Sequence, residues 1–216
     1  MKYGVIGFSG RLGSEVVRHF NDSGHKLTFK LDLNTEEFIE KPDVMIDCSL
    51  PEAFDKTVNL IRMNKLPLVI ASTGLTEDQI NQLKEISVET PVVQSYNFSI
   101  GVQILLHLAK VAKIYLPDWD VEISETHHRF KKDKPSGTAK MIRDTLNDNS
   151  INVSSLRLGN ITGEHSVYFA SAGDKIEITH TALSRRTFAE GILLSAGFIL
   201  GKEKGFFSFR DVVFGT

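Results

Sequence analysis

Residues 1–13 read Met-Lys-Tyr-Gly-Val-Ile-Gly-Phe-Ser-Gly-Arg-Leu-Gly, and this stretch decides the fold. Tyr3–Ile6 is a short apolar run, as expected of a buried parallel strand. The glycines that follow are spaced G-x-x-G-x-x-G and lead into a helical pattern over Gly13–Asn21. Such glycines permit a tight strand-to-helix turn and let a pyrophosphate approach the free N–H groups of the helix. The stretch therefore predicts a dinucleotide-binding βαβ unit whose glycine loop holds the pyrophosphate.

Asp32 strengthens this interpretation over a glycine-rich turn that binds nothing. It follows the second predicted strand, Leu27–Leu31, 22 residues after Gly10. A carboxylate at this position accepts hydrogen bonds from the adenosine ribose hydroxyls. It also repels a 2′-phosphate, so we expect NADH to be preferred, while the positive charges of Lys30 and Arg11 leave room for NADPH.

The first hundred residues continue to alternate apolar strand-like runs with helix-like segments, which favours βαβ units and a parallel sheet with helices on both faces. Pro51 suits the first turn of a helix, and Thr76 with Gln79 predicts a capping box. The expected strands are Tyr3–Ile6, Leu27–Leu31, Val44–Cys48, Leu68–Ile70 and Val92–Gln94, and a helix is expected over Glu52–Asn64.

The pattern changes after Ser99. A long amphipathic helix over Val102–Tyr115 precedes several alternating segments with few helices between them, which predicts a mainly antiparallel sheet. The last helical segment, Phe188–Leu200, is followed by a tail that is expected to return to the first domain. The fold class is therefore α/β, with a Rossmann-type doubly wound domain (1–99, completed by 185–216) and an α+β domain (100–184) for substrate binding and oligomerisation. The alternating segments are near Val121 and over Val153–Leu158, His165–Phe169 and Lys175–His180.

The richest chemistry lies in residues 125–139, Glu-Thr-His-His-Arg-Phe-Lys-Lys-Asp-Lys-Pro-Ser-Gly-Thr-Ala. Two imidazoles and several cations precede a helix start, a combination suited to a small anion. The Gly137 and Thr138 N–H groups and the Thr138 hydroxyl can hold a carboxylate, while Lys131, His127 and His128 neutralise charge and deliver a proton. A solvated basic loop is the alternative, and two adjacent histidines argue against it.

Composition excludes several other classes. The 216 residues are 41% hydrophobic and 24% charged, with a net charge of −2, so no global positive field favours a nucleic acid or an anionic membrane surface. No apolar stretch approaches the roughly 18 residues of a membrane helix, and no signal-peptide run opens the chain. The single cysteine, Cys48, cannot form an internal disulfide, so we expect a cytoplasmic protein. No ligand spacing indicates a metal site.

Together these motifs resemble the 4-hydroxy-tetrahydrodipicolinate reductase family, also called the dihydrodipicolinate reductase family, over nearly the whole chain. The string H-H-R-x-K-x-D-x-P-S-G-T-A is highly specific to that family, whereas the glycine loop is shared by many dehydrogenases. The other matching segments are Ala71–Gly74, Ser95–Gly101, Arg157–Gly159, Gly163–His165 and His180–Arg185 with Phe188-Ala189.

The resemblance implies reduction of a cyclic dicarboxylate to tetrahydrodipicolinate in diaminopimelate and lysine synthesis, by a homotetramer that uses NADH or NADPH. It implies that His127 is the catalytic acid/base residue, Lys131 the proton donor and His128 a substrate ligand, with Gly137 and Thr138 as a carboxylate clamp. It also implies cofactor contacts at Gly7, Phe8, Ser9, Gly10, Arg11 and Leu12 of the glycine loop, at Asp32, and at Ala71, Ser72, Thr73, Ser95, Tyr96, Asn97 and Phe98. Ala71-Ser72 stands where the family usually has Gly-Thr, so a methyl group lies near the expected nicotinamide position.

Two other functions remain open. A semialdehyde dehydrogenase shares the two-domain plan but needs a reactive cysteine at a helix start, which Cys48 in its apolar strand does not offer. A regulatory protein that senses dinucleotides without turnover would be expected to lack the second polar cluster.

Overall fold

The computed structural model describes residues 1–33 and 35–215. They form two compact units, one of residues 1–98 and 186–215 and the other of Ser99–Arg185. None of the helices in the described part of the chain has the length and apolarity that a membrane span requires.

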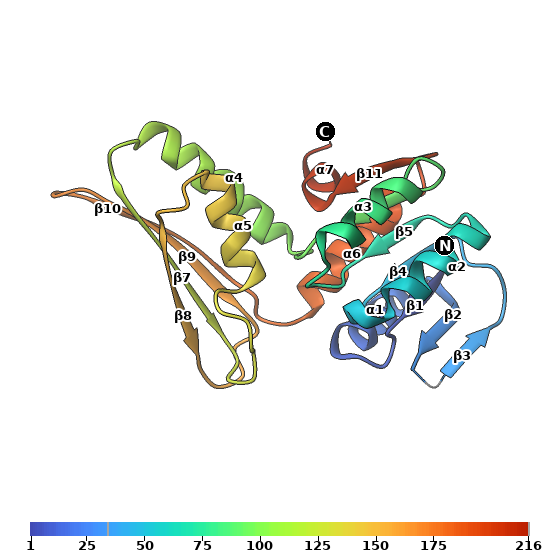
Figure 1. The fold of residues 1–216 in the computed structure, drawn as a ribbon. Coiled ribbons are helices and arrows are strands. Elements are labelled where there is room, and N and C mark those ends of the chain that lie inside the picture. Colours follow the sequence, from blue (N-terminus) through green and yellow to red (C-terminus); the bar gives the residue numbers. More distant parts are fainter. Residues whose placement is uncertain (34, 216) are drawn as a thin grey trace. The chain divides into compact units, whose positions relative to one another are not determined.

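The first unit is built on a seven-stranded sheet (Figure 1). Its strand order is β11-β6-β5-β4-β1-β2-β3, and all neighbouring pairs are parallel except β2 and β3. The five strands expected from the sequence are all present, each within a residue or two of its expected bounds. The strands are β1 (Lys2–Ile6), β2 (Lys26–Asp32), β3 (Thr35–Phe38), β4 (Val44–Asp47), β5 (Leu68–Ile70), β6 (Pro91–Gln94) and β11 (Gly205–Ser208).

Helices cover both faces of this sheet, because the buried strands are apolar on both sides. Successive residues of β4 show this: Val44 and Ile46 pack into one hydrophobic cluster and Met45 into the other. The first cluster includes side chains of α1, α6 and α7, and the second includes side chains of α2 and α3. The doubly wound architecture is therefore confirmed. The helices are α1 (Arg11–Asp22), α2 (Phe54–Asn64), α3 (Glu77–Ile86), α6 (Arg186–Ile199) and α7 (Phe209–Phe214).

The sheet reverses its direction of growth at β1, which lies between β2 and β4. In open sheets of this kind, ligands bind outside the carboxyl ends of the strands at such a reversal. The loops that follow β1, β4, β5 and β6 all emerge at that edge.

Some local details of the first unit differ from the sequence-based expectations, and others agree with them. The 3-10 turn η1 (Pro51–Ala53) contains Pro51, so the α-helix begins only at Phe54. Strands β3 and β11 are not among the expected strands: β3 is exposed and mostly polar, and β11 has no fully buried residue. The C-terminal tail belongs to the first unit and there forms helix α7. The capping box at Thr76 is confirmed, with Gln79 N–H donating to Thr76 Oγ1 at 3.2 Å.

The second unit is a four-stranded sheet with two helices over one face (Figure 1). Its order is β10-β9-β7-β8, and only β7 and β8 are parallel because helix α5 crosses between them. Its core combines helix residues such as Val102 and Ile142 with sheet residues such as Ile123 and Phe169. The elements are α4 (Ile100–Tyr115), β7 (Asp120–His127), α5 (Gly137–Leu146), β8 (Asn152–Arg157), β9 (Glu164–Ala170) and β10 (Lys175–Thr181).

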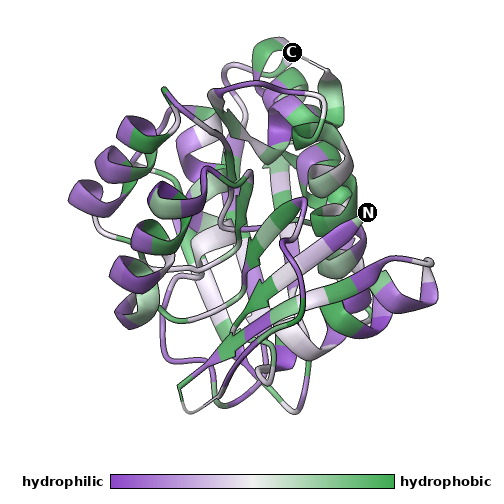
Figure 2. Ribbon diagram, turned by 90° about the vertical axis from the view of Figure 1, so that its right-hand side faces the viewer, coloured by the Kyte–Doolittle hydropathy of each residue, from purple (hydrophilic) through white to green (hydrophobic). Residues whose placement is uncertain are grey.

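Figure 2 colours the ribbon by hydropathy: the helices carry both hydrophilic and hydrophobic residues, and the strands include hydrophobic stretches. The mainly antiparallel second sheet expected from the alternating segments is confirmed.

Candidate active site

The glycine loop lies between β1 and α1, and two of its glycines are required by the backbone. Gly7 has a φ of +76°, and a Cβ there would meet the backbone of Ser49 at 2.8 Å. A Cβ on Gly13 would lie 2.0 Å from the carbonyl oxygen of Gly7. These contacts bring the first turn of α1 close to the end of β1. The N–H groups of that turn have no partner within the helix and are suited to an anionic group.

Asp32 ends β2 beside this loop. Its carboxylate accepts hydrogen bonds from the backbone N–H and hydroxyl of Ser9 and from the N–H of Leu33. The hydrogen bond from the Ser9 hydroxyl is the main reason that the pKa of Asp32 lies below its usual value. Lys30 pairs with Glu37 of β3 at 2.7 Å, so its charge is already partly neutralised. Arg11 is exposed at the start of α1.

The loops after β4 and β5 are fastened to each other by Asp47. This buried carboxylate accepts hydrogen bonds from the Ser49 hydroxyl at 2.6 Å and from the Thr57 hydroxyl at 2.7 Å. The Ser72 hydroxyl lies within hydrogen-bond distance of both Asp47 Oδ1, at 3.0 Å, and the Ser49 carbonyl oxygen, at 2.9 Å. Ala71 is nearly buried and packs in the first hydrophobic cluster. Its methyl group is therefore core packing, whereas Thr73, two residues further on, is exposed.

The loop after β6 divides its four predicted residues between interior and surface. Ser95 Oγ donates to the carbonyl oxygen of Asn97 and accepts from its N–H, at 2.8 and 3.2 Å. Tyr96 is exposed, whereas the ring of Phe98 is buried 5.1 Å from the ring of Phe209. The side chain of Phe98 is thus part of the core.

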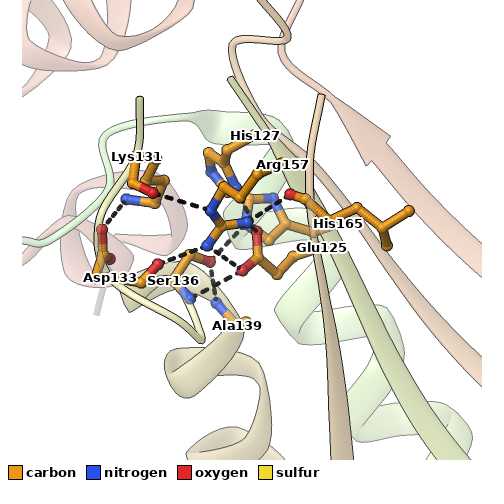
Figure 3. Close-up of polar contacts among 9 residues, drawn as sticks. Glu125, His127, Lys131, Asp133, Ser136, Ala139, Arg157 and His165 are labelled. Atoms are coloured by element: carbon orange, nitrogen blue, oxygen red, sulfur yellow. Dashed lines mark hydrogen bonds and ion pairs between the residues drawn. The ribbon is translucent and has the colours of Figure 1, made fainter. Parts of the chain in front are cut away.

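The second unit gathers a set of charged and polar groups around a buried carboxylate (Figure 3). Glu125 is 1% exposed, and its carboxylate accepts hydrogen bonds from both terminal nitrogens of Arg157, at 2.7 and 2.8 Å. The Ser136 N–H donates to its Oε1 at 3.2 Å, and His127 Nδ1 lies 2.5 Å from its Oε2. Strands β7 and β8 set this geometry, because Glu125, His127 and Arg157 lie on adjacent parallel strands with their side chains on the helix-covered face.

Burial and charge act in opposite directions on these groups. Burial alone would raise the pKa of Glu125, but the hydrogen bonds from Arg157 and His127 outweigh it and lower the pKa to about 2. The pKa of His127 is lowered, mainly by burial and further by the charges of Lys131 and Arg157, against the opposing effect of Glu125. Burial lowers the pKa of His165 to about 3. At neutral pH the carboxylate is ionised and both histidines are neutral.

Lys131 follows β7 in the loop that Arg157 holds. Arg157 donates through Nε to the Lys131 carbonyl oxygen at 3.3 Å and through a terminal nitrogen to that of Asp133 at 2.5 Å. The Lys131 ammonium pairs with the Asp133 carboxylate at 2.8 Å. The ring centroid of His128 lies 6.4 Å from that of Phe130. The two predicted catalytic residues, His127 and Lys131, are thus held by one guanidinium-centred network.

Helix α5 begins beside this network. Its N-cap is Ser136, whose hydroxyl accepts from the N–H of Ala139 at 3.2 Å. The same hydroxyl lies 3.2 Å from Nε2 of His165 on β9. Gly137 and Thr138, the predicted carboxylate clamp, are the first two residues of the helix.

Sequence reasoning did not assign roles to three of these residues. Glu125 and Arg157 lie far apart in the sequence, and their pairing depends on the register of β7 and β8. His165 lies on β9, and its ring centroid lies 5.1 Å from that of His127. The available signal for Glu125 was its position two residues before His127, which puts both side chains on one face of a strand.

These features define a class. The first unit has the glycine loop, acidic strand end and strand-order reversal of nucleotide-dependent oxidoreductases, and the second has a cationic cluster with a histidine held by a carboxylate. The pKa of the Cys48 thiol is raised, mainly by burial, so this residue does not provide the reactive cysteine of a semialdehyde dehydrogenase.

Comparison with known proteins specifies the class further. Residues 22–98 match the dihydrodipicolinate reductase N-terminus profile and residues 101–213 match the C-terminus profile. The chain is 45% identical to the 4-hydroxy-tetrahydrodipicolinate reductase of Thermosipho africanus, over 99% of this chain and 98% of the relative. It is 37% identical to that of Caldanaerobacter subterraneus subsp. tengcongensis, over 97% of this chain and 96% of the relative.

A solved structure shares the fold. It is the dipicolinate-bound dihydrodipicolinate reductase of Paenisporosarcina sp. TG-14, with a TM-score of 0.79, 23% identity and coverage of 96% of this chain and 97% of that one. The chain belongs to the dihydrodipicolinate reductase family, and the prediction of that family from the sequence motifs is confirmed.

Proposed function

We propose that this chain reduces 4-hydroxy-tetrahydrodipicolinate to tetrahydrodipicolinate in lysine and diaminopimelate biosynthesis, with NADH or NADPH as the hydride donor. In the overall reaction the cofactor delivers a hydride, one proton is taken up and the hydroxyl group leaves as water. The observation that carries the proposal is the buried Glu125–His127–Arg157 cluster, because His127 opens the family's most specific motif and Arg157 holds the Lys131 loop.

The substrate carries two carboxylates, and the second unit offers suitable partners for them. The N–H groups of Gly137 and Thr138 open helix α5, where the helix dipole favours a negative group. His128 and the cations of residues 129–134 lie in the segment that leads to this helix start. We assign one carboxylate to Gly137 and Thr138, and His128 as a further substrate ligand.

Proton transfer falls to Lys131 and His127. Hydride addition to a ring conjugated with an imine leaves electron density that a proton must neutralise, and a nearby cation stabilises the transition state. Lys131, whose ammonium pairs with the Asp133 carboxylate, supplies that proton. His127 acts as the acid/base residue.

The first unit is assigned to the cofactor, which supplies the hydride when bound. The close approach allowed by Gly7 and Gly13 suits a pyrophosphate, and the Asp32 carboxylate suits ribose hydroxyls. We assign the exposed residues Thr73 and Tyr96 to contacts with the nicotinamide half of the cofactor. NADH is the preferred cofactor because Lys30 is paired with Glu37 and offers little charge to a 2′-phosphate.

We also propose that the chain assembles as a homotetramer through its second unit, as the family resemblance implies. Light scattering of the purified protein, coupled to size-exclusion chromatography, measures the subunit count.

A coupled assay tests the function. A synthase generates the unstable substrate in the cuvette, and the purified chain is added with NADH or with NADPH. We expect loss of absorbance at the reduced-nicotinamide band only when the synthase and both of its substrates are present. Cofactor binding without any such loss would indicate the non-catalytic sensor instead, and oxidation independent of the synthase would indicate another substrate.

A further inference from the structure

We infer that Glu125 is a positioning residue that fixes the single proton of His127 on Nδ1, so that Nε2 is an unprotonated acceptor, and that Gly163 keeps the space beside Nε2 clear. This inference rests on the proposed function for its catalytic meaning, because it refines how His127 takes part in that reaction. Its structural content, the tautomer and the clear space, can be measured without turnover.

The first step concerns the proton between Glu125 and His127. An ionised carboxylate can only accept hydrogen bonds, so the nitrogen facing it must carry a hydrogen. Glu125 Oε2 lies 2.5 Å from Nδ1 of His127, and each oxygen of the carboxylate also accepts a hydrogen bond from Arg157. The bidentate guanidinium keeps the carboxylate ionised and prevents it from taking the histidine's proton. Nδ1 therefore donates.

The second step concerns the overall charge of His127. The charged groups that face it are Glu125 on its own strand, Arg157 on β8 and Lys131 in the following loop. From β9 it meets His165, whose ring lies edge-on to it at 74° and is neutral. Burial and the two cations outweigh the carboxylate, so the pKa of His127 falls below its usual value. With one proton, and that proton on Nδ1, the Nε2 atom holds a lone pair.

The third step concerns the space beside Nε2. A Cβ at Gly163 would lie 3.1 Å from Nε2 and 3.4 Å from Cδ2 of His127, closer than side chains normally approach. The backbone of Gly163 does not lie in the left-handed region, so conformation alone does not demand glycine there. What glycine supplies is room at the one imidazole nitrogen that is not engaged by Glu125.

The arrangement has a direct chemical consequence. Nε2 can accept a proton, and the fixed negative charge of Glu125 stabilises the imidazolium that forms, while the Arg157 contacts keep the carboxylate in place. In the resting state Nε2 of His127 is therefore a proton acceptor, and the proton donor of the pair is Lys131.

Nitrogen-15 NMR of the protein labelled at its histidine imidazoles tests the tautomer. His127→Asn assigns the resonances of His127. At pH 7.5 we expect a protonated, pyrrole-like shift for Nδ1 and an unprotonated, pyridine-like shift for Nε2. The opposite pattern, or protonation of both nitrogens, would overturn the inference even if the enzyme turned over normally. The expected pattern in a protein without reductase activity would instead support the positioning role and refute the proposed function.

Glu125→Gln tests the positioning role in catalysis. The amide retains the shape but lacks the charge, so we expect kcat to fall roughly 100-fold with little change in the dissociation constant of NADH. The limb of the kcat–pH profile that reports His127 should move to lower pH, because the imidazolium loses its partner. An equal loss of activity at every pH, with the limb unmoved, would indicate a merely structural role. Should this variant fail to fold, the wild-type NMR measurement and the glycine variant below still decide the question.

Gly163→Ala tests the clear space, with Gly173→Ala as its matched control. A Cβ at Gly173 meets nothing within 4 Å. We expect Gly163→Ala to lower kcat at least about tenfold while the Nδ1–H pattern of His127 persists, and Gly173→Ala to behave as wild type. Full activity of Gly163→Ala would show that the space beside Nε2 is not used.

Discussion

At the scale of single residues, Lys131 is distinguished from the neighbouring lysines by its fixed position. Arg157 holds its backbone, Asp133 pairs with its ammonium, and its side chain is largely buried, whereas Lys132 is exposed. We predict that Lys131→Ala lowers kcat by about 10²–10³ because both a proton donor and a nearby charge are lost. The dissociation constant of NADH, measured by fluorescence titration, should stay within about twofold.

Lys132→Ala provides the control, since it removes the same charge one position away. It should retain nearly full kcat. Equal losses in the two variants would mean that the segment acts only through its overall positive charge and would remove Lys131 as the specific donor.

Asp32 is the residue on which cofactor preference depends. Its carboxylate lies beside the glycine loop, held by Ser9, and it repels a 2′-phosphate. We predict that Asp32→Ala raises kcat/KM for NADPH relative to NADH by roughly tenfold, mostly through a higher KM for NADH. Steady-state kinetics with both cofactors measures this ratio, and an unchanged ratio would place the ribose elsewhere.

At the scale of elements, two helical glycines have opposite roles. A Cβ on Gly13 in α1 would collide with the Gly7 carbonyl, whereas Gly197 in α6 is exposed with nothing near its Cβ position. We predict that Gly13→Ala destabilises the first unit by about 3 kcal/mol, because helix and strand must separate. Gly197→Ala should stabilise it by about 0.5–1 kcal/mol through helix propensity.

Urea unfolding followed by circular dichroism measures both changes. Gly13→Ala should in addition weaken NADH binding, because the first turn of α1 moves. Two variants with the same stability would mean that α1 can shift without cost, which the 2.0 Å approach to the Gly7 carbonyl argues against.

At the scale of the whole molecule, buried histidines make stability depend on pH. The pKa of His165 is about 3 in the folded chain, and the pKa values of His127 and His180 are also lowered, in each case mainly by burial. Each of these histidines binds its proton more readily in the unfolded chain. Its burial in the neutral form therefore costs no stability above a pH of about 6.5, and the folded state loses stability as the pH falls below that value. Glu125 acts in the same direction below a pH of about 4.5.

We therefore predict that the urea midpoint falls as the pH is lowered from 7 to 5. The slope has an upper limit of roughly 1.4 kcal/mol per pH unit for each titrating histidine. His165→Gln should flatten this dependence, whereas His107→Gln, on the exposed side of α4, should leave it unchanged. A urea midpoint independent of pH in the wild-type chain would contradict the inference that these histidines are buried in their neutral form.

Local patterns were sufficient for much of the fold. The strands β1, β4, β5 and β6 are mostly apolar, Leu27, Phe29 and Leu31 mark β2, and the cap at Thr76 is a four-residue signal. Strand β3 shows where such reasoning ends: its residues Thr35–Phe38 are exposed, and they form a strand only because β2 offers an edge to pair with.

The sequence by itself determined the two architectures, the glycine loop with Asp32 and the motif of residues 125–139, because each depends on periodicity or on neighbours along the chain. Only the tertiary structure decided that Glu125, Arg157 and His165 surround His127. Those contacts join three strands through their register, and the protonation states follow from the burial that this register produces. Neither register nor burial can be read from the types of residue alone, because both are set by the packing of segments distant in sequence.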